Sequence, residues 1–220
     1  MLYSKKTVQI LVITAIFAVA MAYLEATIVV YLRKIYYPAG FHFPLVYVPR
    51  SIWLIEAGRE IATIIMLSAL ARLIAVKGQT VFACFCYSFG IWDIWYYVWL
   101  KILLNWPASF LDWDVLFLIP LPWLGPVLAP LLVSIVLITA ALVMLFFESR
   151  EQPLHFSRLE TSLELLAGLL IILSFFTEVQ TIPLQQEPQN YPWWLFASGM
   201  ILGLAVFIRR IYLQHTNPPL

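Results

Sequence analysis

Apolar runs long enough to cross a lipid bilayer constrain this chain more than any other feature. A transmembrane helix needs about 20 consecutive, mostly apolar residues. Six segments reach that length, joined by short polar or proline-containing links: residues 7–32, 51–76, 80–104, 124–147, 161–180 and 193–213. The sequence therefore predicts an all-α fold, with six transmembrane helices in a single membrane domain over residues 1–220.

The composition agrees with a membrane protein. Of 220 residues, 63% are hydrophobic and only 11% are charged, whereas about a quarter of the residues of a soluble domain are charged. The lipid bilayer is thus the expected partner of most of the surface. Nucleic acid is not an expected partner, because the sequence has no basic patch and its aromatic residues lie inside apolar runs.

The distribution of lysine and arginine predicts the orientation, since these residues are enriched in cytoplasmic connections. With the N-terminus inside, eight of them lie on the cytoplasmic side: Lys5, Lys6, Arg72, Lys77, Arg150, Arg158, Arg209 and Arg210. Four lie on the outer side: Arg33, Lys34, Arg50 and Lys101. Both termini are therefore predicted to be cytoplasmic.

Charged residues inside the predicted helices are the first candidates for a function. The segment IEAGRE carries Glu56, Arg59 and Glu60 within an otherwise apolar helix, where each charge costs several kcal/mol unless it is paired, hydrated or functional. Helical rise places Glu56 about 7 Å and Glu60 about 13 Å below the outer boundary. Glu25 and Asp93 lie at similar depth in the first and third helices. Three consecutive helices thus place acids in the outer half of the membrane.

Helical spacing predicts that these polar groups share one space. Glu56 and Glu60 are i,i+4 neighbours, and Arg59 lies beside them. The third helix has a small and polar stripe at steps of three and four: Cys86, Gly90, Asp93, Tyr97 and Lys101. The first has another: Thr14, Ala18, Ala22 and Glu25. Small residues let membrane helices approach closely, so we expect these faces to meet, with Tyr97 and Lys101 lining the entrance.

Charge counting limits what this space contains. Four carboxylates and one arginine cannot all be ionised in a dry site, because burial and like charges raise carboxyl pKa values. A proton, water or a bound cation must therefore compensate for the surplus. Alternatively, Arg59 pairs with two acids and the others hydrogen-bond as neutral groups, so that the cluster only locks three helices together.

Metal and cofactor sites are weaker alternatives. A carboxylate-only site would suit a hard divalent cation, with four candidate ligands: Glu25, Glu56, Glu60 and Asp93. No other cofactor is expected. Haem is not, because His42, His155 and His215 all lie outside the predicted helices.

The outer connection, residues 106–123, carries Asp112 and Asp114, and an apolar run with prolines at 120, 122, 126 and 130 begins within it and continues to residue 130. Such dense prolines oppose a regular helix, yet the stretch is too apolar for an ordinary loop. We expect an interfacial or partly re-entrant segment that covers the outer mouth of the bundle. Asp112 is alternatively the N-cap residue of a short helix there.

Four stretches within residues 20–130 resemble a group of small bacterial multi-span inner-membrane proteins: AYLEATIVVYLR, IEAGREIAT, GIWDIWYY and DVLFLIPLPWLGPVLAP. The resemblance implies a location in the bacterial inner membrane and carries no activity with it.

Three functions fit the residues. The leading one is transport or binding of a proton, a cation or a small polar solute in an outward-facing acidic pocket, which for transport requires a path inward from Thr63 towards Ser68. The second is an accessory subunit of a membrane complex or homo-oligomer, which requires a lipid-facing patch of small residues. The third is an enzyme that acts on a lipid or isoprenoid, which requires a pocket lined by acids and aromatic residues.

Overall fold

The protein is described here from a computed structural model that defines residues 5–216. Its helices are α1 (Lys5–Tyr36), α2 (Arg50–Ile74), α3 (Gly78–Leu104), α4 (Leu128–Ser149), α5 (Arg158–Ser174) and α6 (Trp193–Thr216). Two short strands, β1 (Trp113–Val115) and β2 (Leu124–Pro126), and a 3₁₀ turn at Val179–Thr181 complete the described elements. The prediction of an all-helical protein with several apolar helices is thus confirmed. Five helices (all but α2) are long and apolar enough to cross a membrane.

Two helices are shorter than predicted, the fourth at its start and the fifth at its end. The fourth was expected to start at residue 124, but residues 124–126 form β2 and α4 begins at Leu128. The fifth begins where Ser157 and Glu160 form a capping box and ends at Ser174, before the expected residue 180. A short strand replaces helix in the first case and turn residues replace it in the second, both at the same end of the bundle.

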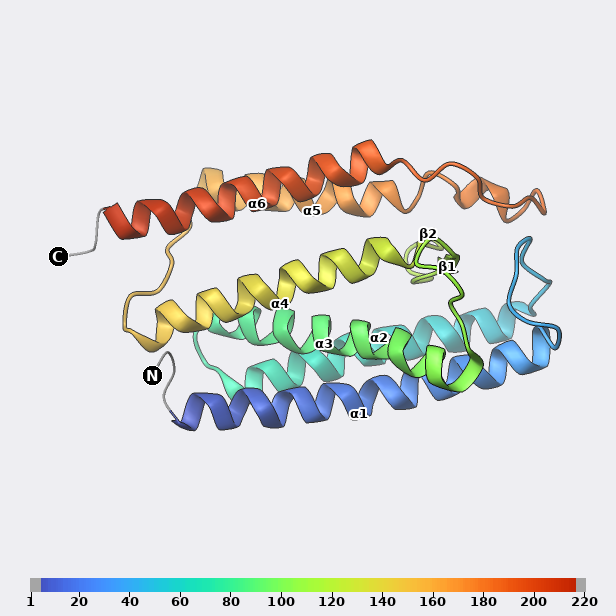
Figure 1. Ribbon diagram of the computed structural model, residues 1–220, viewed down its shortest axis with the longest axis horizontal. Helices are drawn as coiled ribbons and strands as arrows, with labels where there is room; N and C mark the ends of the chain where they lie inside the picture. The colour runs from blue at the N-terminus through green and yellow to red at the C-terminus, as the bar shows by residue number, and fades with distance from the viewer. Residues whose placement is uncertain (1–4, 217–220) are drawn as a thin grey trace.

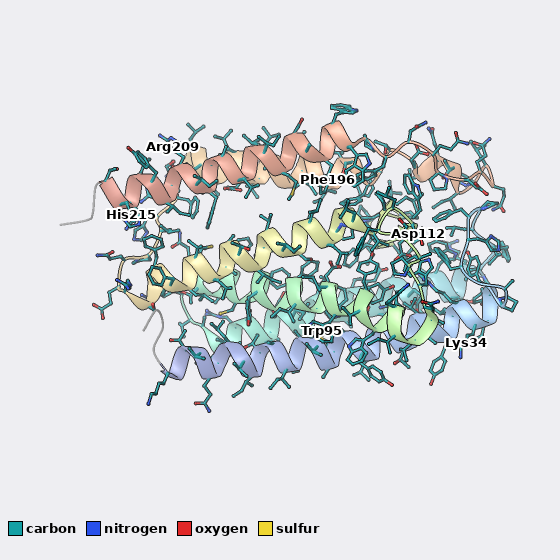
Figure 2. The ribbon with its side chains drawn as sticks, viewed as in Figure 1. Lys34, Trp95, Asp112, Phe196, Arg209 and His215 are labelled. Carbon is teal, nitrogen blue, oxygen red and sulfur yellow. The ribbon has the colours of Figure 1, made fainter. Side chains whose placement is uncertain are left out.

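The helices lie roughly side by side, and α3 is the central one, packing against α1, α2 and α4 (Figure 1). Helices α5 and α6 form a hairpin on the far side of α4. The start of α1 and the end of α6 lie at one end of the bundle, which we call the terminal end. The β-strands and the connections at 37–49 and 175–192 lie at the other, the capped end. Figure 2 shows Lys34 and Asp112 near the capped end and Arg209 and His215 near the terminal end.

Small residues set the helix contacts. Ala18 and Ala22 on α1 are fully buried and pack with Trp92 of α3. Gly90 lets α3 approach α4 so closely that a Cβ there would lie 2.8 Å from the carbonyl oxygen of Ser134. Gly199 does the same for α6 on α5, where a Cβ would lie 2.7 Å from the carbonyl oxygen of Ala167. These close approaches bury helix faces that carry little apolar side-chain volume.

An antiparallel pair of strands crosses the capped end, with Asp114 opposite Gly125. The turn between the strands reaches into the bundle, and the Phe117 ring stacks on Phe89 with centroids 6.5 Å apart. Phe89 lies ~22 Å of helical rise from the end of α3 at Leu104. This connection contains no helix in the described chain, so Asp112 does not act as an N-cap.

Candidate functional site

Arg59 is the centre of the polar contacts between α1 and α2. Its guanidinium forms ion pairs with Glu25 of α1 and with Glu56 one turn before it, the latter at 2.9 Å. Thr63 also donates a hydrogen bond to Glu25, at 3.1 Å. The helical spacing of α2 thus presents a cation and a donor to the acid of α1. Glu25, Glu56, Arg59 and Thr63 thus lie together between α1 and α2.

Glu60 belongs to the same face of α2 but has a different partner. Its side chain is buried, and Oε2 accepts a hydrogen bond of 2.8 Å from the backbone N–H of Leu118, in the turn between β1 and β2. Within residues 5–216 it forms no ion pair. The sequence placed Glu60 beside Arg59 and gave no sign that a loop amide from 58 positions away would meet it.

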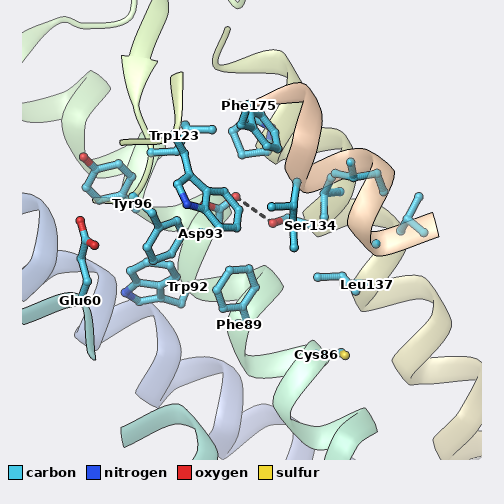
Figure 3. A pocket seen from close by; sticks show the side chains of 18 of the residues that line it. Glu60, Cys86, Phe89, Trp92, Asp93, Tyr96, Trp123, Ser134, Leu137 and Phe175 are labelled. Atoms are coloured by element: carbon cyan, nitrogen blue, oxygen red, sulfur yellow. Dashed lines mark hydrogen bonds between the residues drawn. The ribbon is translucent and has the colours of Figure 1, made fainter. Parts of the chain in front are cut away.

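Asp93 faces α4, whereas we predicted that it faces α1 and α2. Its buried carboxylate accepts a hydrogen bond of 2.7 Å from the Ser134 hydroxyl of α4 (Figure 3). Gly90 and Asp93 therefore face α4 rather than α1 and α2, because the missing side chain of Gly90 admits α4 there. Trp92 and Tyr96, on the adjoining face, lie between Asp93 and Glu60 (Figure 3).

Asp114 forms a second buried ion pair that the sequence did not reveal. Its Oδ1 lies 2.7 Å from the guanidinium of Arg33, near the end of α1. That guanidinium also lies 3.8 Å from the Trp106 ring centroid and 4.2 Å from that of Phe41. Burial raises the pKa of the Asp114 carboxyl above its usual value, although the nearby guanidinium lowers it. Tyr97 lies beside the same carboxylate.

The remaining predicted residues lie outside this arrangement. Lys101, which we expected at the entrance, is exposed and donates a 2.8 Å hydrogen bond to the carbonyl of Pro107. Asp112 accepts from the backbone amides of Ala108 and Ser109 at 2.7 and 3.2 Å and holds a turn. Among residues 5–216, no three carboxyl, histidine or cysteine groups are placed to hold a metal ion. The structure therefore does not gather Glu25, Glu56, Glu60 and Asp93 around one centre.

One cavity of about 1320 Å³ contacts the acidic residues of α1, α2 and α3 and extends along α4. Near the capped end it reaches all five buried or half-buried acids and the two arginines: Glu25, Glu56, Glu60, Asp93, Asp114, Arg33 and Arg59. It then continues between α4 and the α5–α6 hairpin, where apolar side chains predominate. Aromatic rings, including those of Phe89, Trp92 and Trp123, line the region where the two parts join (Figure 3).

The arrangement provides acceptors rather than a catalytic pair. Glu60 and Asp93 both carry acceptor oxygens near the cavity, but the rings of Trp92 and Tyr96 lie between them. A general acid and base acting on one reacting centre must both lie within hydrogen-bond reach of it.

Comparison of the chain with known proteins gave no match to a family model, to a curated protein or to a solved structure.

Proposed function

We propose that this chain is a multi-pass protein of the bacterial inner membrane that takes up a proton, a cation or a small polar solute in an outward-facing acidic cavity. The capped end is then the outer side, and both termini are cytoplasmic. The lysine and arginine distribution supports this orientation, because Arg33, Lys34, Arg50 and Lys101 are the few at the capped end.

The proposal takes α2 as a sixth membrane span. Its 25 residues give a rise of about 37 Å, enough to cross a bilayer. The charges that make α2 less apolar than the other helices are Glu56, Arg59 and Glu60, and each of them has a partner inside the bundle. Paired intramembrane charges that face a bundle interior are compatible with a span. The turn around Phe117 is then a re-entrant segment that covers the outer mouth.

The observation that carries the proposal is the charge balance of the cavity. The cavity is lined by two arginines and by six carboxyl residues: Glu25, Glu56, Glu60, Asp93, Asp114 and, between α4 and the hairpin, Glu164. The described contacts pair Arg59 with Glu25 and Glu56 and pair Arg33 with Asp114. Glu60 and Asp93 form no ion pair in residues 5–216 and accept hydrogen bonds from neutral donors instead. The cavity therefore favours a proton or a positively charged or hydrogen-bond-donating ligand, and repels an anion.

The competing functions have less support. Ser68 is exposed on the outside of α2, so the path we expected from Thr63 does not continue there; an inward path would follow α4 and α5 instead. The cavity does combine acids with aromatic rings, as an enzyme for lipids would, but Glu60 and Asp93 lie apart. Much of the outer surface of the helices carries large aliphatic side chains such as Ile16 and Leu24, rather than the small residues of a subunit interface.

Thermal unfolding of the purified protein in phosphatidylcholine nanodiscs tests the proposal. The probe is butylammonium, with sodium, magnesium and calcium chlorides at equal ionic strength. A ligand at a hundredfold excess over its Kd stabilises by about 2.7 kcal/mol, which raises the Tm of a chain of this size by about 5–10 °C. We expect this rise with at least one cation, and its loss in the variant Glu60→Gln/Asp93→Asn.

The matched control is Glu148→Gln, which removes one carboxylate at the terminal end, where Glu148 pairs with the exposed Lys77. This variant should keep the full response to the cation. Cation binding in the cavity is ruled out if no cation raises the Tm, and its assignment to Glu60 and Asp93 is wrong if the Glu60→Gln/Asp93→Asn variant responds as strongly as the parent protein.

A further inference from the structure

The apolar part of the cavity is a long cleft between α4 and the α5–α6 hairpin. Along α5 and its C-cap residue it is lined from Thr161 to Phe175, which corresponds to ~21 Å of helical rise. The opposite walls include Leu137 and Met144 of α4 and Phe207 of α6. One leaflet of a bilayer has a hydrocarbon depth of ~15 Å. The cleft is therefore as long as an extended lipid chain.

The cleft opens sideways towards the hydrocarbon of the bilayer. Leu165, Leu169 and Ile208 all line it, and their side chains are 71%, 50% and 60% exposed. Residues that face both the cleft and the membrane mark a gap between helices rather than a closed chamber. A lipid chain can enter through this gap without crossing water.

One end of the cleft is polar and aromatic. The Asp93–Ser134 pair lies there, and Trp123 stacks on Phe175 with centroids 5.9 Å apart near the capped end. Trp92, which also lines the cavity, adds a ring face beside Asp93. Aromatic faces attract cations, and the attraction is strongest where water is excluded. Acid, ring faces and a mainly apolar wall thus follow one another along a single cavity, and Glu164 of α5 also lines its apolar part.

Resting on the function proposed above, we propose that the ligand is an amphiphile with one long hydrocarbon chain and a protonated amino head group. The ammonium binds Asp93 among the aromatic rings, and the chain lies in the cleft between α4 and the α5–α6 hairpin. A phosphate or carboxylate head group does not fit, because Arg33 and Arg59 already pair with acids and the surplus charge is negative.

Tryptophan fluorescence quenching tests this ligand class. Hexadecylamine with bromine atoms in the half of its chain nearest the amine is titrated into phosphatidylcholine nanodiscs that contain the protein. Hexadecanoic acid and hexadecanol brominated at the same positions are the head-group controls. We expect saturable quenching by the amine only, a roughly tenfold weaker apparent affinity in Asp93→Asn, and a smaller quenched fraction in Trp123→Phe. Trp194→Phe, at a side chain that is 73% exposed on α6, should behave as the parent protein.

Two glycines provide a matched pair for the cleft itself. A Cβ at Gly168 of α5 or at Gly58 of α2 would meet nothing within 4 Å, but only Gly168 lines the cavity. Gly168→Phe should remove the saturable quenching by filling the cleft. Gly58→Phe adds the same ring to the outer face of the bundle and should keep it.

The outcomes separate the two proposals. If butylammonium raises the Tm through Glu60 and Asp93 but the brominated amine gives only non-saturable quenching, the chain site is wrong and the cation site stands. If the acid and the alcohol quench as well as the amine, or Gly168→Phe and Gly58→Phe behave alike, the ligand assignment is overturned. The assignment is also overturned if each nanodisc contains two chains of the parent protein but only one chain of the Gly168→Phe variant. A second copy of the protein, rather than a lipid chain, would then fill the cleft.

Discussion

The α1–α4 unit and the α5–α6 hairpin are held by different kinds of contact. Polar contacts tie the first unit together at depth: Arg59 joins α1 to α2, and Asp93 joins α3 to α4. The two helices of the hairpin are held together by their close approach around Gly199. On the inner face of the hairpin, one oxygen of Glu164 has no hydrogen-bond partner in residues 5–216. Its connection to the rest is concentrated at the capped end, where Leu124 donates a 2.9 Å backbone hydrogen bond to Phe175.

This difference explains where the cavity lies. Helices in a bilayer gain little from apolar contact alone, because lipid chains are equally apolar, so their association depends on close packing and on polar contacts. Between α4 and the hairpin there is no polar contact at mid-depth among the described residues, and contact there is sparse. The gap that results is the cleft. The same reasoning makes the two parts respond differently to substitution.

The largest effect is expected from Arg59→Met, which breaks the α1–α4 unit at its centre. It leaves Glu25 and Glu56 without their cation inside the bundle, and removing one partner from a buried ion pair costs about 3–5 kcal/mol. We expect a loss near 5 kcal/mol in the free energy of unfolding, measured by denaturant titration in mixed micelles.

The control is Arg209→Met in the hairpin. Arg209 pairs with Glu160 of α5 but is 64% exposed, and exposed pairs contribute about 0–1 kcal/mol. Equal losses in the two variants would contradict the contrast between the two parts.

The second effect concerns the ion pair at the capped end. Asp114→Asn should lower the free energy of unfolding by about 3 kcal/mol, because the Arg33 guanidinium is left buried beside a neutral group. The double variant Arg33→Met/Asp114→Leu should recover most of that loss, since apolar residues of similar volume replace buried ion pairs well. If the double variant is less stable than Asp114→Asn, the ion pair makes a larger net contribution to the free energy of unfolding than apolar residues in its place.

Part of this arrangement was predictable from the sequence because it is local. Glu56, Arg59 and Glu60 lie within five residues of one another on a helix whose period is known, so their shared face followed directly. The six helical segments followed from apolar length in the same way. The contacts of Asp93 and Arg33 were not predictable, because Ser134 and Asp114 are 41 and 81 positions away. Which side of α3 receives α4 depends on Gly90, and the small-residue stripe did not identify its partner helix.

A third pair of variants compares the glycines of the two parts. A Cβ at Gly90 or Gly199 would lie 2.7–2.8 Å from atoms of the neighbouring helix, backbone oxygens among them. Gly90→Ala and Gly199→Ala should each lower the free energy of unfolding by about 1–3 kcal/mol. Gly168→Ala, with open space around it, should instead raise it by up to about 1 kcal/mol through helix propensity. A neutral Gly199→Ala would show that the hairpin adjusts where the α1–α4 unit does not.

The smallest effect, and the one of opposite sign, is expected from Glu164→Met. Glu164 Oε1 is buried with no hydrogen-bond partner in residues 5–216, whereas the Glu60 carboxylate accepts from the Leu118 amide. An unsatisfied buried polar group costs about 1–3 kcal/mol, so replacing Glu164 with an apolar side chain of similar length should stabilise the protein by about 1 kcal/mol. Glu60→Met should destabilise it by a similar amount, because the Leu118 N–H loses its acceptor. Both values come from the same denaturant titrations. If Glu164→Met is instead less stable than the parent protein, the Glu164 carboxyl forms a stabilising hydrogen bond with a molecule inside the cleft.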